Sequence, residues 1–193
     1  MINYLIGIDE VGRGPIAGPV AVCSFKCKPD FFDFISINTP LRDSKKLSRK
    51  QREEWFLYLK GEKQKGNCDF AVSMVSAELI DKVGIVRSIT KALITSLLKV
   101  VENPKEVSIY LDGGLKAPKE YENQETIIKG DELHPVISCA SIVAKVSRDR
   151  VMALHAKEYP EYGFENHMGY GTKAHYEAIK NKGMTPLHRK TFL

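Results

Sequence analysis

Apolar residues along the chain recur with two periods, one typical of strands and one typical of helices. Short apolar runs at residues 4–9 and 107–111 predict two buried strands, and the alternation over residues 69–75 predicts a third. A strand at residues 20–26 follows the first across a glycine-rich corner, as in a hairpin with a long loop. Residues 125–129 complete the set of expected strands.

Helical spacing and end signals predict four helices. A Ser-x-x-Gln capping box opens a helix over residues 48–60. Apolar residues three and four positions apart predict helices over residues 84–102 and 137–157, and a threonine cap and a glycine bound a last helix at residues 172–183. Residues 29–43 have no clear period, so we interpret them as a surface excursion.

The order of these elements defines a fold class. Strands and helices are intermixed, and the first hairpin argues against a purely parallel sheet. We therefore predict an α/β fold with a mixed sheet covered by helices. The 193 residues correspond to one domain over residues 1–193, in which about residues 160–193 form a helical C-terminal region. We find no signal peptide and no membrane-spanning run, and expect a cytoplasmic protein.

Composition narrows the function only loosely. Apolar residues make up 43% of the chain, which is enough for a packed core and too much for a disordered protein. The net charge of +5, from 29 basic and 24 acidic residues, permits a phosphate-rich partner without proving one. The four cysteines lack the spacing of a zinc site, and we interpret them as small apolar residues: Cys23, Cys27, Cys68 and Cys139.

Acidic residues stand at the ends of three predicted strands, or just beyond them. Asp9 and Glu10 end the first strand, Asp112 follows residues 107–111, and Asp131 follows the last. Because strand ends at one sheet edge converge, these carboxylates could form one cluster of the kind that Mg²⁺ and Mn²⁺ prefer, and a cation would relieve their repulsion. The alternative is that each is an ordinary turn former, and spacing alone favours that alternative.

Other residues could contact a nucleic acid. Glycines in Gly12-Arg13-Gly14 could let backbone groups approach a ligand while the arginine meets a phosphate, although a plain tight turn fits as well. Tyr170, flanked by glycines, could stack on a base or sugar, or simply pack under the last helix. We assign no catalytic role to any histidine. Basic side chains that could hold a phosphate backbone or face water are Lys45, Lys46, Lys145, Arg148 and Arg150.

Six blocks of sequence, taken together and in order, resemble ribonuclease HII, the type 2 ribonuclease H. They span nearly the whole chain, although residues 24–42 and 49–106 contribute little. The blocks are GIDEVGRGPIAGPV (7–20), DSKKLS (43–48), LDG (111–113), KGDE (129–132), ISCASIVAKVSRDR (137–150), and GYGTKAH (169–175) with PLHRKTF (186–192).

The resemblance implies a ribonuclease H-like fold, with a five-stranded mixed sheet, helices on both sides and a helical C-terminal region. It also implies that Asp9, Glu10, Asp112 and Asp131 are catalytic and bind two Mg²⁺ or Mn²⁺ ions. All four positions carry the expected acid.

Substrate-binding residues are implied in the same way. Gly12, Arg13 and Gly14 would recognise the 2′-hydroxyl and the phosphate at an RNA–DNA junction, and Tyr170 would pack against the following deoxyribose. Residues that fit the family's phosphate-contacting blocks are Lys45, Ser141 and Lys145.

The implied enzyme is a metal-dependent endoribonuclease. It would hydrolyse the RNA strand of RNA–DNA hybrids and nick DNA duplexes 5′ of embedded ribonucleotides by a two-metal-ion mechanism, leaving 3′-hydroxyl and 5′-phosphate ends. We expect a monomer with nucleic-acid partners and no membrane association, and the first strand at residue 4 leaves no room for the extra N-terminal domain usual in ribonuclease HIII. Alternatives are a DNA-directed nuclease of the same fold and a silent binding module; the GRG segment argues against the first and the complete acid set against the second.

Overall fold

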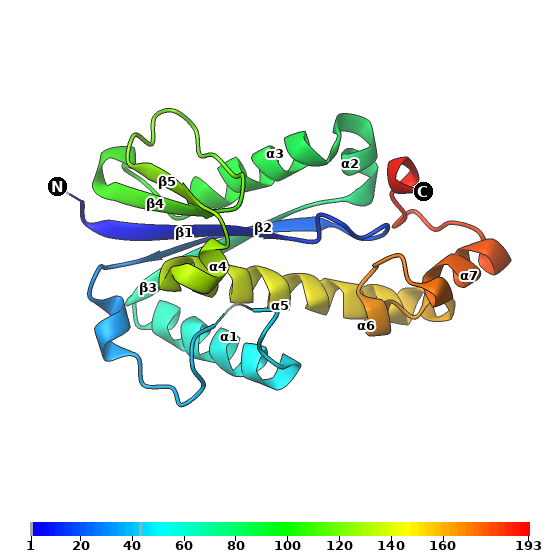
Figure 1. The fold of residues 1–193 in the computed structure, drawn as a ribbon, viewed down its shortest axis with the longest axis horizontal. Coiled ribbons are helices and arrows are strands. Elements are labelled where there is room, and N and C mark those ends of the chain that lie inside the picture. The colour runs from blue at the N-terminus through cyan, green and yellow to red at the C-terminus, as the bar shows by residue number, and fades with distance from the viewer. Residues whose placement is uncertain (1, 43) are drawn as a thin grey trace.

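A five-stranded mixed sheet lies at the centre of the protein, in a computed structural model that describes residues 2–42 and 44–193 (Figure 1). Its order is β3-β2-β1-β4-β5, with β1 antiparallel to β2 and parallel to β4. Asp43, the first residue of the DSKKLS block, lies outside the described residues. The strands are β1 (Tyr4–Val11), β2 (Val20–Cys27), β3 (Cys68–Val75), β4 (Val107–Asp112) and β5 (Gln124–Ile127).

Helices cover both faces of the sheet, as Figure 1 shows. On one face α2 (Ala77–Val83) and α3 (Ile85–Leu97) lie over β2 and β3, and on the other α5 (Pro135–Glu158) lies over β1 and β2, with α1 (Arg49–Gln64) beside it. The remaining helices are α4 (Gly130–Leu133), α6 (Phe164–His167), α7 (Lys173–Lys182) and the 3₁₀ turns Phe31–Phe34, Pro104–Glu106, Pro160–Tyr162 and Lys190–Phe192.

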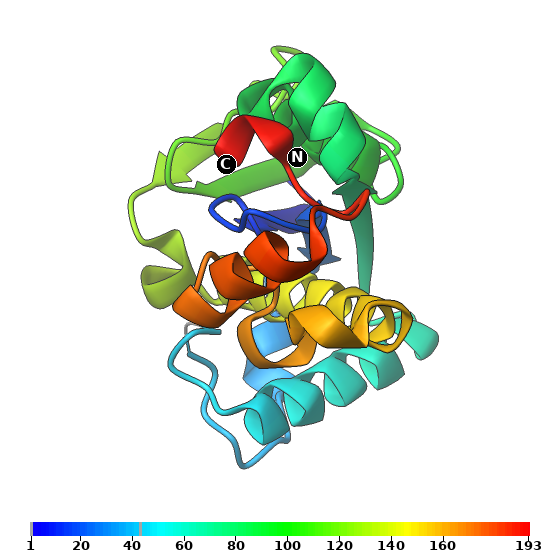
Figure 2. The ribbon, with the colours of Figure 1, turned by 90° about the vertical axis from the view of Figure 1, so that its right-hand side faces the viewer.

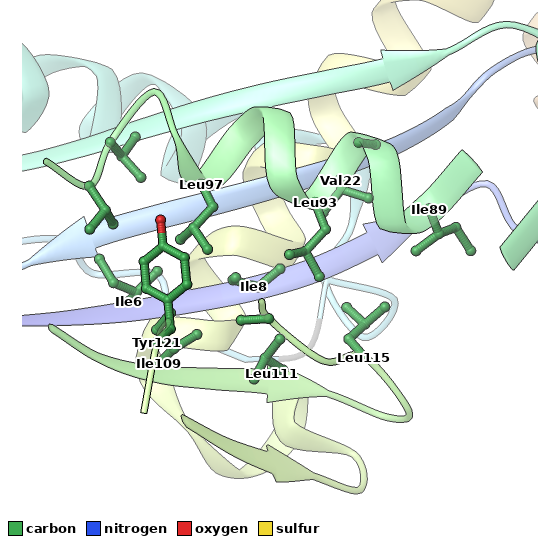
Figure 3. Packing of buried hydrophobic residues seen from close by; sticks show 14 of the residues in the cluster. Ile6, Ile8, Val22, Ile89, Leu93, Leu97, Ile109, Leu111, Leu115 and Tyr121 are labelled. Atoms are coloured by element: carbon green, nitrogen blue, oxygen red, sulfur yellow. The ribbon is translucent and has the colours of Figure 1, made fainter. Parts of the chain in front are cut away.

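Alternation along the strands divides the interior into two cores. Ile6 and Ile8 of β1 point toward α3, where they pack with Leu93 and Leu97 (Figure 3). The intervening side chains face α5, which is buried along most of its length and packs with α1 and β2 in the second core. The sheet is therefore covered on both sides, as predicted.

A glycine lets α5 lie directly on the central strand. A Cβ atom at Gly7 would overlap the backbone carbonyl of Val136, in the first turn of α5. This close approach fixes the height of α5 above β1 and therefore the position of every side chain that the helix presents to the sheet.

Several element boundaries differ from the sequence-based expectation. The helix expected over residues 84–102 begins at Ile85 and ends at Leu97, because Gly84, with φ of 83°, separates it from α2, which the sequence analysis missed. The strand expected over residues 125–129 ends at Ile127, and Lys129 adopts a left-handed conformation with φ of 56°. Local patterns do not distinguish one long helix from two that meet at a glycine.

The segment interpreted as a surface excursion is only partly on the surface. Phe31 is buried, and its ring meets Phe25 of β2 edge-on, with 5.8 Å between centroids.

The first helix also runs past residue 60 to Gln64, and the carboxylate of Glu62 accepts hydrogen bonds from Lys65 and Asn67.

The C-terminal elements gather at one end of the sheet, beside the loop that joins β1 to β2 (Figure 2). A small third core ties them to it, in which Ala17 of that loop packs with Met152 of α5 and with Phe164. Among the described residues, no helix is both long and apolar enough to cross a membrane.

The packing at Gly7 makes a prediction about stability. Gly7→Ala should lower the free energy of unfolding by about 1–3 kcal/mol, because the added methyl group must push α5 away from β1. In thermal denaturation that loss corresponds to about 2–4 °C in melting temperature per kcal/mol. Gly61→Ala is the control, since Gly61 lies in a helix with nothing within 4 Å of its Cβ position, and it should stabilise by about 0.5–1 kcal/mol. Equal melting temperatures for the two variants would contradict this account.

Candidate active site

Asp9 and Asp112 stand side by side at neighbouring strand ends. The last paired residues of parallel β1 and β4 immediately precede them. Alternation places both side chains on the face covered by α5, the same face as Leu5 and Tyr110. Asp9 is 4% exposed, so one carboxylate of the pair is buried between the sheet and a helix.

Asp131 reaches the same place from a short helix beyond the end of β5, and the sequence patterns did not predict this helix. The left-handed residue Lys129 turns the chain out of β5, and α4 begins at Gly130. The backbone N–H of Gly130 donates to Asp112 Oδ1 at 2.7 Å. This bond ties the segment that carries Asp131, itself buried, to the acid at the end of β4.

The acids interact through their charges. Burial is the main reason that the pKa of Asp9 is raised well above its usual value, and the negative charges of Glu10, Asp112 and Asp131 raise it further. A hydrogen bond from the Ser141 side chain acts in the opposite direction. The four acids that the sequence analysis selected therefore form one electrostatic cluster.

Glu10 occupies the other side of the strand. Its pKa is raised by burial and lowered by Arg13, whose Nη1 lies 3.5 Å from Glu10 Oε1. This ion pair links the acid cluster to the first residues of the loop that follows β1.

Donors within the protein already engage these carboxylates. Asp131 Oδ2 lies 3.2 Å from Lys45 Nζ, and Asp9 Oδ1 accepts from the backbone N–H of Glu10 at 2.7 Å. Over residues 2–42 and 44–193, no three His, Cys, Asp or Glu side chains stand in a ready-made metal-binding arrangement. The cluster nevertheless fits a hard divalent cation, because it offers carboxylate oxygens and its mutual repulsion would be relieved by positive charge. Such an ion would replace the internal donors.

The two glycines of the Gly12-Arg13-Gly14 segment have different roles. Gly12 is buried with φ of 89°, and a Cβ atom there would overlap the Arg148 side chain, so internal packing explains this glycine. Gly14 is exposed, and its Cβ position meets only the Tyr170 ring, at 3.8 Å. No internal contact requires a glycine at position 14, which leaves its backbone open to a ligand.

Tyr170 lies against this loop, next to Gly14. Its side chain is 48% exposed, so it does not simply pack under the last helix. Backbone N–H groups of Ile16 and Ala17 donate to the carbonyl of Gly169, which fixes the tyrosine loop against the loop that follows β1. The described structure thus brings Gly14 and Tyr170, far apart in sequence, to one place.

The three residues assigned to phosphate contact lie in different environments. The Lys45 side chain is 75% exposed and pairs with Asp131. Ser141 is buried, and its hydroxyl lies 2.8 Å from that of Ser44. Lys145 Nζ pairs with Asp149 at 2.9 Å. Ser141 can therefore influence a substrate only through its neighbours, including Asp9.

The expectation that Arg148 holds phosphate or faces water is wrong. Its side chain is fully buried and donates to backbone carbonyls, whereas Arg150, two residues on and therefore on the opposite face of the helix, pairs with Glu53 at 2.6 Å. Helical spacing alone cannot tell which basic residue of a helix faces inward when the neighbouring loop is not yet placed.

Sequence analysis also missed a histidine cluster next to Tyr170. His175 and His188 are buried, and their Nε2 atoms lie 3.1 Å apart. The backbone N–H of Thr185 donates to His188 Nδ1 at 2.8 Å, so the proton of His188 sits on Nε2 and is donated to His175. His175 in turn donates from Nδ1 to the carbonyl of Tyr170 at 2.8 Å. The sequence signal for this pair is weak: one histidine in each of the two last motif blocks, 13 residues apart.

Comparison with known proteins gives the class of enzyme. The crystal structure of ribonuclease H2 from Pyrococcus horikoshii matches with a TM-score of 0.75 at 25% identity, covering 97% of this chain and 93% of that one. Bst ribonuclease HIII, determined in complex with Mn²⁺, matches with a TM-score of 0.72 at 16% identity, covering 98% of this chain and 67% of that one. The fold is therefore that of the type 2 ribonucleases H, with the five-stranded mixed sheet that was predicted.

Sequence comparison identifies the family. The ribonuclease HII family model matches residues 6–193. Ribonuclease HII of Endomicrobium trichonymphae is 44% identical over 187 residues, which are 96% of this chain and 83% of the relative. The chain belongs to the ribonuclease HII family and is a metal-dependent endoribonuclease, a hydrolase that acts on the RNA strand of RNA–DNA hybrids.

The histidine pair predicts a specific loss of stability in acid. Burial lowers the pKa of His175 to about 4, while the unfolded chain titrates near 6.5. Between these values the unfolded state binds more protons, so stability falls as pH falls; from pH 7.5 to pH 5 the loss is about 2 kcal/mol, or about 4–8 °C. His188, whose pKa is also lowered by burial, adds a loss of the same sign.

The measurement is the melting temperature of wild type and His175→Asn across pH 4.5–7.5. The asparagine keeps an N–H donor for the Tyr170 carbonyl, and comparison at each pH cancels the contribution of the carboxylates. His155→Asn, outside the cluster on α5, is the matched control. His175→Asn should have a lower melting temperature than wild type at pH 7.5 but lose fewer degrees on acidification. Parallel curves of melting temperature against pH for wild type and His175→Asn would mean that His175 is not the titrating group.

Proposed function

We propose that two Mg²⁺ or Mn²⁺ ions bind to a site formed by Asp9, Glu10, Asp112 and Asp131. With these ions the enzyme would hydrolyse the phosphodiester 5′ of a ribonucleotide, in long hybrids and in DNA with embedded ribonucleotides. The observation that carries this proposal is the burial of Asp9 among three other interacting acids, one of which, Glu10, pairs with Arg13 in the loop that also carries the exposed Gly14. Acids this close lower the stability of the metal-free protein, which makes a purely structural role a poor explanation.

The side chains divide the work by position. Asp9 and Asp112, at adjacent strand ends, would form the rigid part of the ligand set, and Asp131 and Glu10 would approach it from two further directions. Lys45 lies against Asp131 and would meet the substrate phosphate when cations occupy the acids. Bound divalent ions would supply Lewis acidity for the attack of water and for the departure of the 3′-oxygen, leaving 3′-hydroxyl and 5′-phosphate ends.

Substrate discrimination would come from the two loops that face each other. Arg13 and Gly14 are exposed residues, and backbone groups of this segment that Arg189 does not engage would bond the 2′-hydroxyl, the group that distinguishes RNA from DNA. The ring of Tyr170 would lie on the next sugar and disfavour a 2′-hydroxyl there by steric overlap. Residues 160–193 would thus form the part of the protein that contacts the DNA side of the junction.

The direct test is cleavage of a labelled DNA duplex that carries one ribonucleotide, with Mg²⁺, with Mn²⁺ and with a chelator, beside an all-DNA duplex. We expect a metal-dependent nick 5′ of the ribonucleotide and an intact control. Cleavage of a long hybrid without cleavage of this duplex would keep the chemistry and overturn the junction-reading roles, whereas cleavage of all-DNA duplexes would support a DNA-directed nuclease.

Asp9→Asn separates the catalytic role of the cluster from a structural one. It should reduce turnover by more than the 10–100-fold typical of residues that only support a metal ligand. It should also raise the melting temperature of the metal-free protein by about 2–4 °C per kcal/mol of repulsion removed, and weaken stabilisation by Mn²⁺. The control is Asp69→Asn, because Asp69 lies on β3 and its carboxylate pairs with Lys63 of α1. A fully active Asp9→Asn enzyme would remove this acid from the mechanism.

Tyr170→Ala and Gly14→Ala test the reading of the junction. Each should reduce kcat/KM for the single embedded ribonucleotide about 10-fold or more, with a smaller loss on a long hybrid, whose many cleavable positions do not all require a deoxyribose on the 3′ side. Tyr176→Ala, another half-exposed tyrosine of the same region, is the control. Equal losses on both substrates would contradict the role assigned to these two residues.

A further inference from the structure

Two arginines lie fully buried behind the loop that joins β1 to β2. Arg148 and Arg189 are among the largest side chains of the interior, each with 0% exposure. Within the described part of the chain, neither forms a salt bridge with a carboxylate. Burying a charge without a partner is costly, so each guanidinium group needs hydrogen-bond acceptors inside the protein. Backbone carbonyl groups at fixed positions provide them.

Arg189 serves the first part of the loop. Its Nη2 donates to the carbonyl of Gly12 at 2.7 Å, its Nη1 to that of Arg13 at 3.0 Å and its Nε to that of Gly18 at 3.0 Å. The loop therefore curls around one planar guanidinium. Because the Gly12 and Arg13 carbonyls point inward to Arg189, the peptide groups of this segment have a fixed orientation toward the outside.

Arg148 connects the loop with the tyrosine segment. Its Nε donates to the carbonyl of Pro19 at 2.8 Å and its Nη2 to that of Ala17 at 3.3 Å. Its Nη1 donates to the carbonyl of Met168 at 3.0 Å. Met168, two residues before Tyr170, is one of only two non-glycine residues with positive φ in the described chain. This strained backbone is held where an arginine from α5 requires its carbonyl.

Backbone bonds complete the connection. Besides the bonds to Gly169, the N–H of Gly18 donates to the carbonyl of Leu187 and the N–H of Arg189 to that of Ile16, each at 2.8 Å. Hydrogen bonds thus join three separate segments into one unit: the loop after β1, the tyrosine segment and the chain around residue 189. The exposed side of that unit carries Gly14 and Tyr170.

We propose that Arg148 and Arg189 are positioning residues that set the distance between the Gly12–Gly14 backbone and the Tyr170 ring, and thereby the selectivity for an RNA-to-DNA step. This inference rests on the proposed function. Neither arginine touches the substrate. Lysine cannot replace them, because a single ammonium group lacks the planar fork that reaches three carbonyls at once. Burial lowers the pKa of Arg189 only to about 10, so the guanidinium stays charged at neutral pH.

The test compares kcat/KM on the single-ribonucleotide duplex and on a long hybrid for wild type and Arg189→Lys, well below the melting temperature of each. We expect the ratio of the two values to fall about 10-fold, because an error of about 1 Å in substrate placement is enough for such a loss. Phe192→Ala is the second variant: it keeps every hydrogen bond but removes the ring 5.1 Å from the guanidinium, and should shift the ratio in the same direction by a smaller factor.

Two controls separate positioning from general destabilisation. Leu59→Ala destabilises the second core beside Cys68, at the end of the sheet opposite the loop after β1, and should leave the ratio unchanged. In the double variant Arg189→Lys/Tyr170→Ala, the effect of the arginine on the ratio should largely disappear, since the ring that it positions is gone.

The outcomes distinguish this inference from the proposed function. If wild type does not nick the single-ribonucleotide duplex, the proposed function fails. If wild type nicks it and Arg189→Lys and Phe192→Ala slow both substrates equally, the function stands and the positioning role is overturned. Additive effects in the double variant would likewise overturn it.

Discussion

The close contact between α5 and β1 is the constraint on which the rest of the structure depends. Glycine at position 7 allows the helix to begin directly on the central strand. From that starting point its register brings Ser141 to Asp9 and, two turns later, Arg148 beneath the loop after β1. One helix therefore supports both the acids proposed to bind metal and the loop proposed to read the substrate.

Charge is distributed around this helix in an unusual way. Four acids at the ends of β1 and β4 and in α4 repel one another, while the hydrogen-bond acceptors of the two arginines behind the neighbouring loop are carbonyl groups. Both arrangements reduce stability, and both are tolerated because neighbouring packing holds the backbone in place. A substrate that brings cations and phosphates to this end of the sheet would compensate the acids, which is how a strained site becomes a binding site.

Sequence patterns predicted the mixed sheet, and the family resemblance selected the four acids, but neither predicted the way in which each acid reaches the cluster. Asp9 and Asp112 follow from apolar runs that end in an acid, because a buried strand and its end are local features. Asp131 was expected just beyond a strand, and the structure adds that it lies in α4, after the left-handed Lys129. Gly12 and Gly14 look alike in sequence, yet only Gly12 is required by a buried side chain.

The sequence by itself determined the family, the mixed sheet and the residue types of the site, because periodicity and ordered motif blocks are properties of short segments. Tertiary structure alone decided that Arg148 and Arg189 are buried, that His188 donates a hydrogen bond to His175, and that Gly14 faces Tyr170. The physical reason is the same in each case. The arginines bond carbonyl groups about 130 to 175 residues away in the sequence, and the histidine pair is buried by elements that distant segments bring together. Local patterns carry no information about which distant group will satisfy a buried donor.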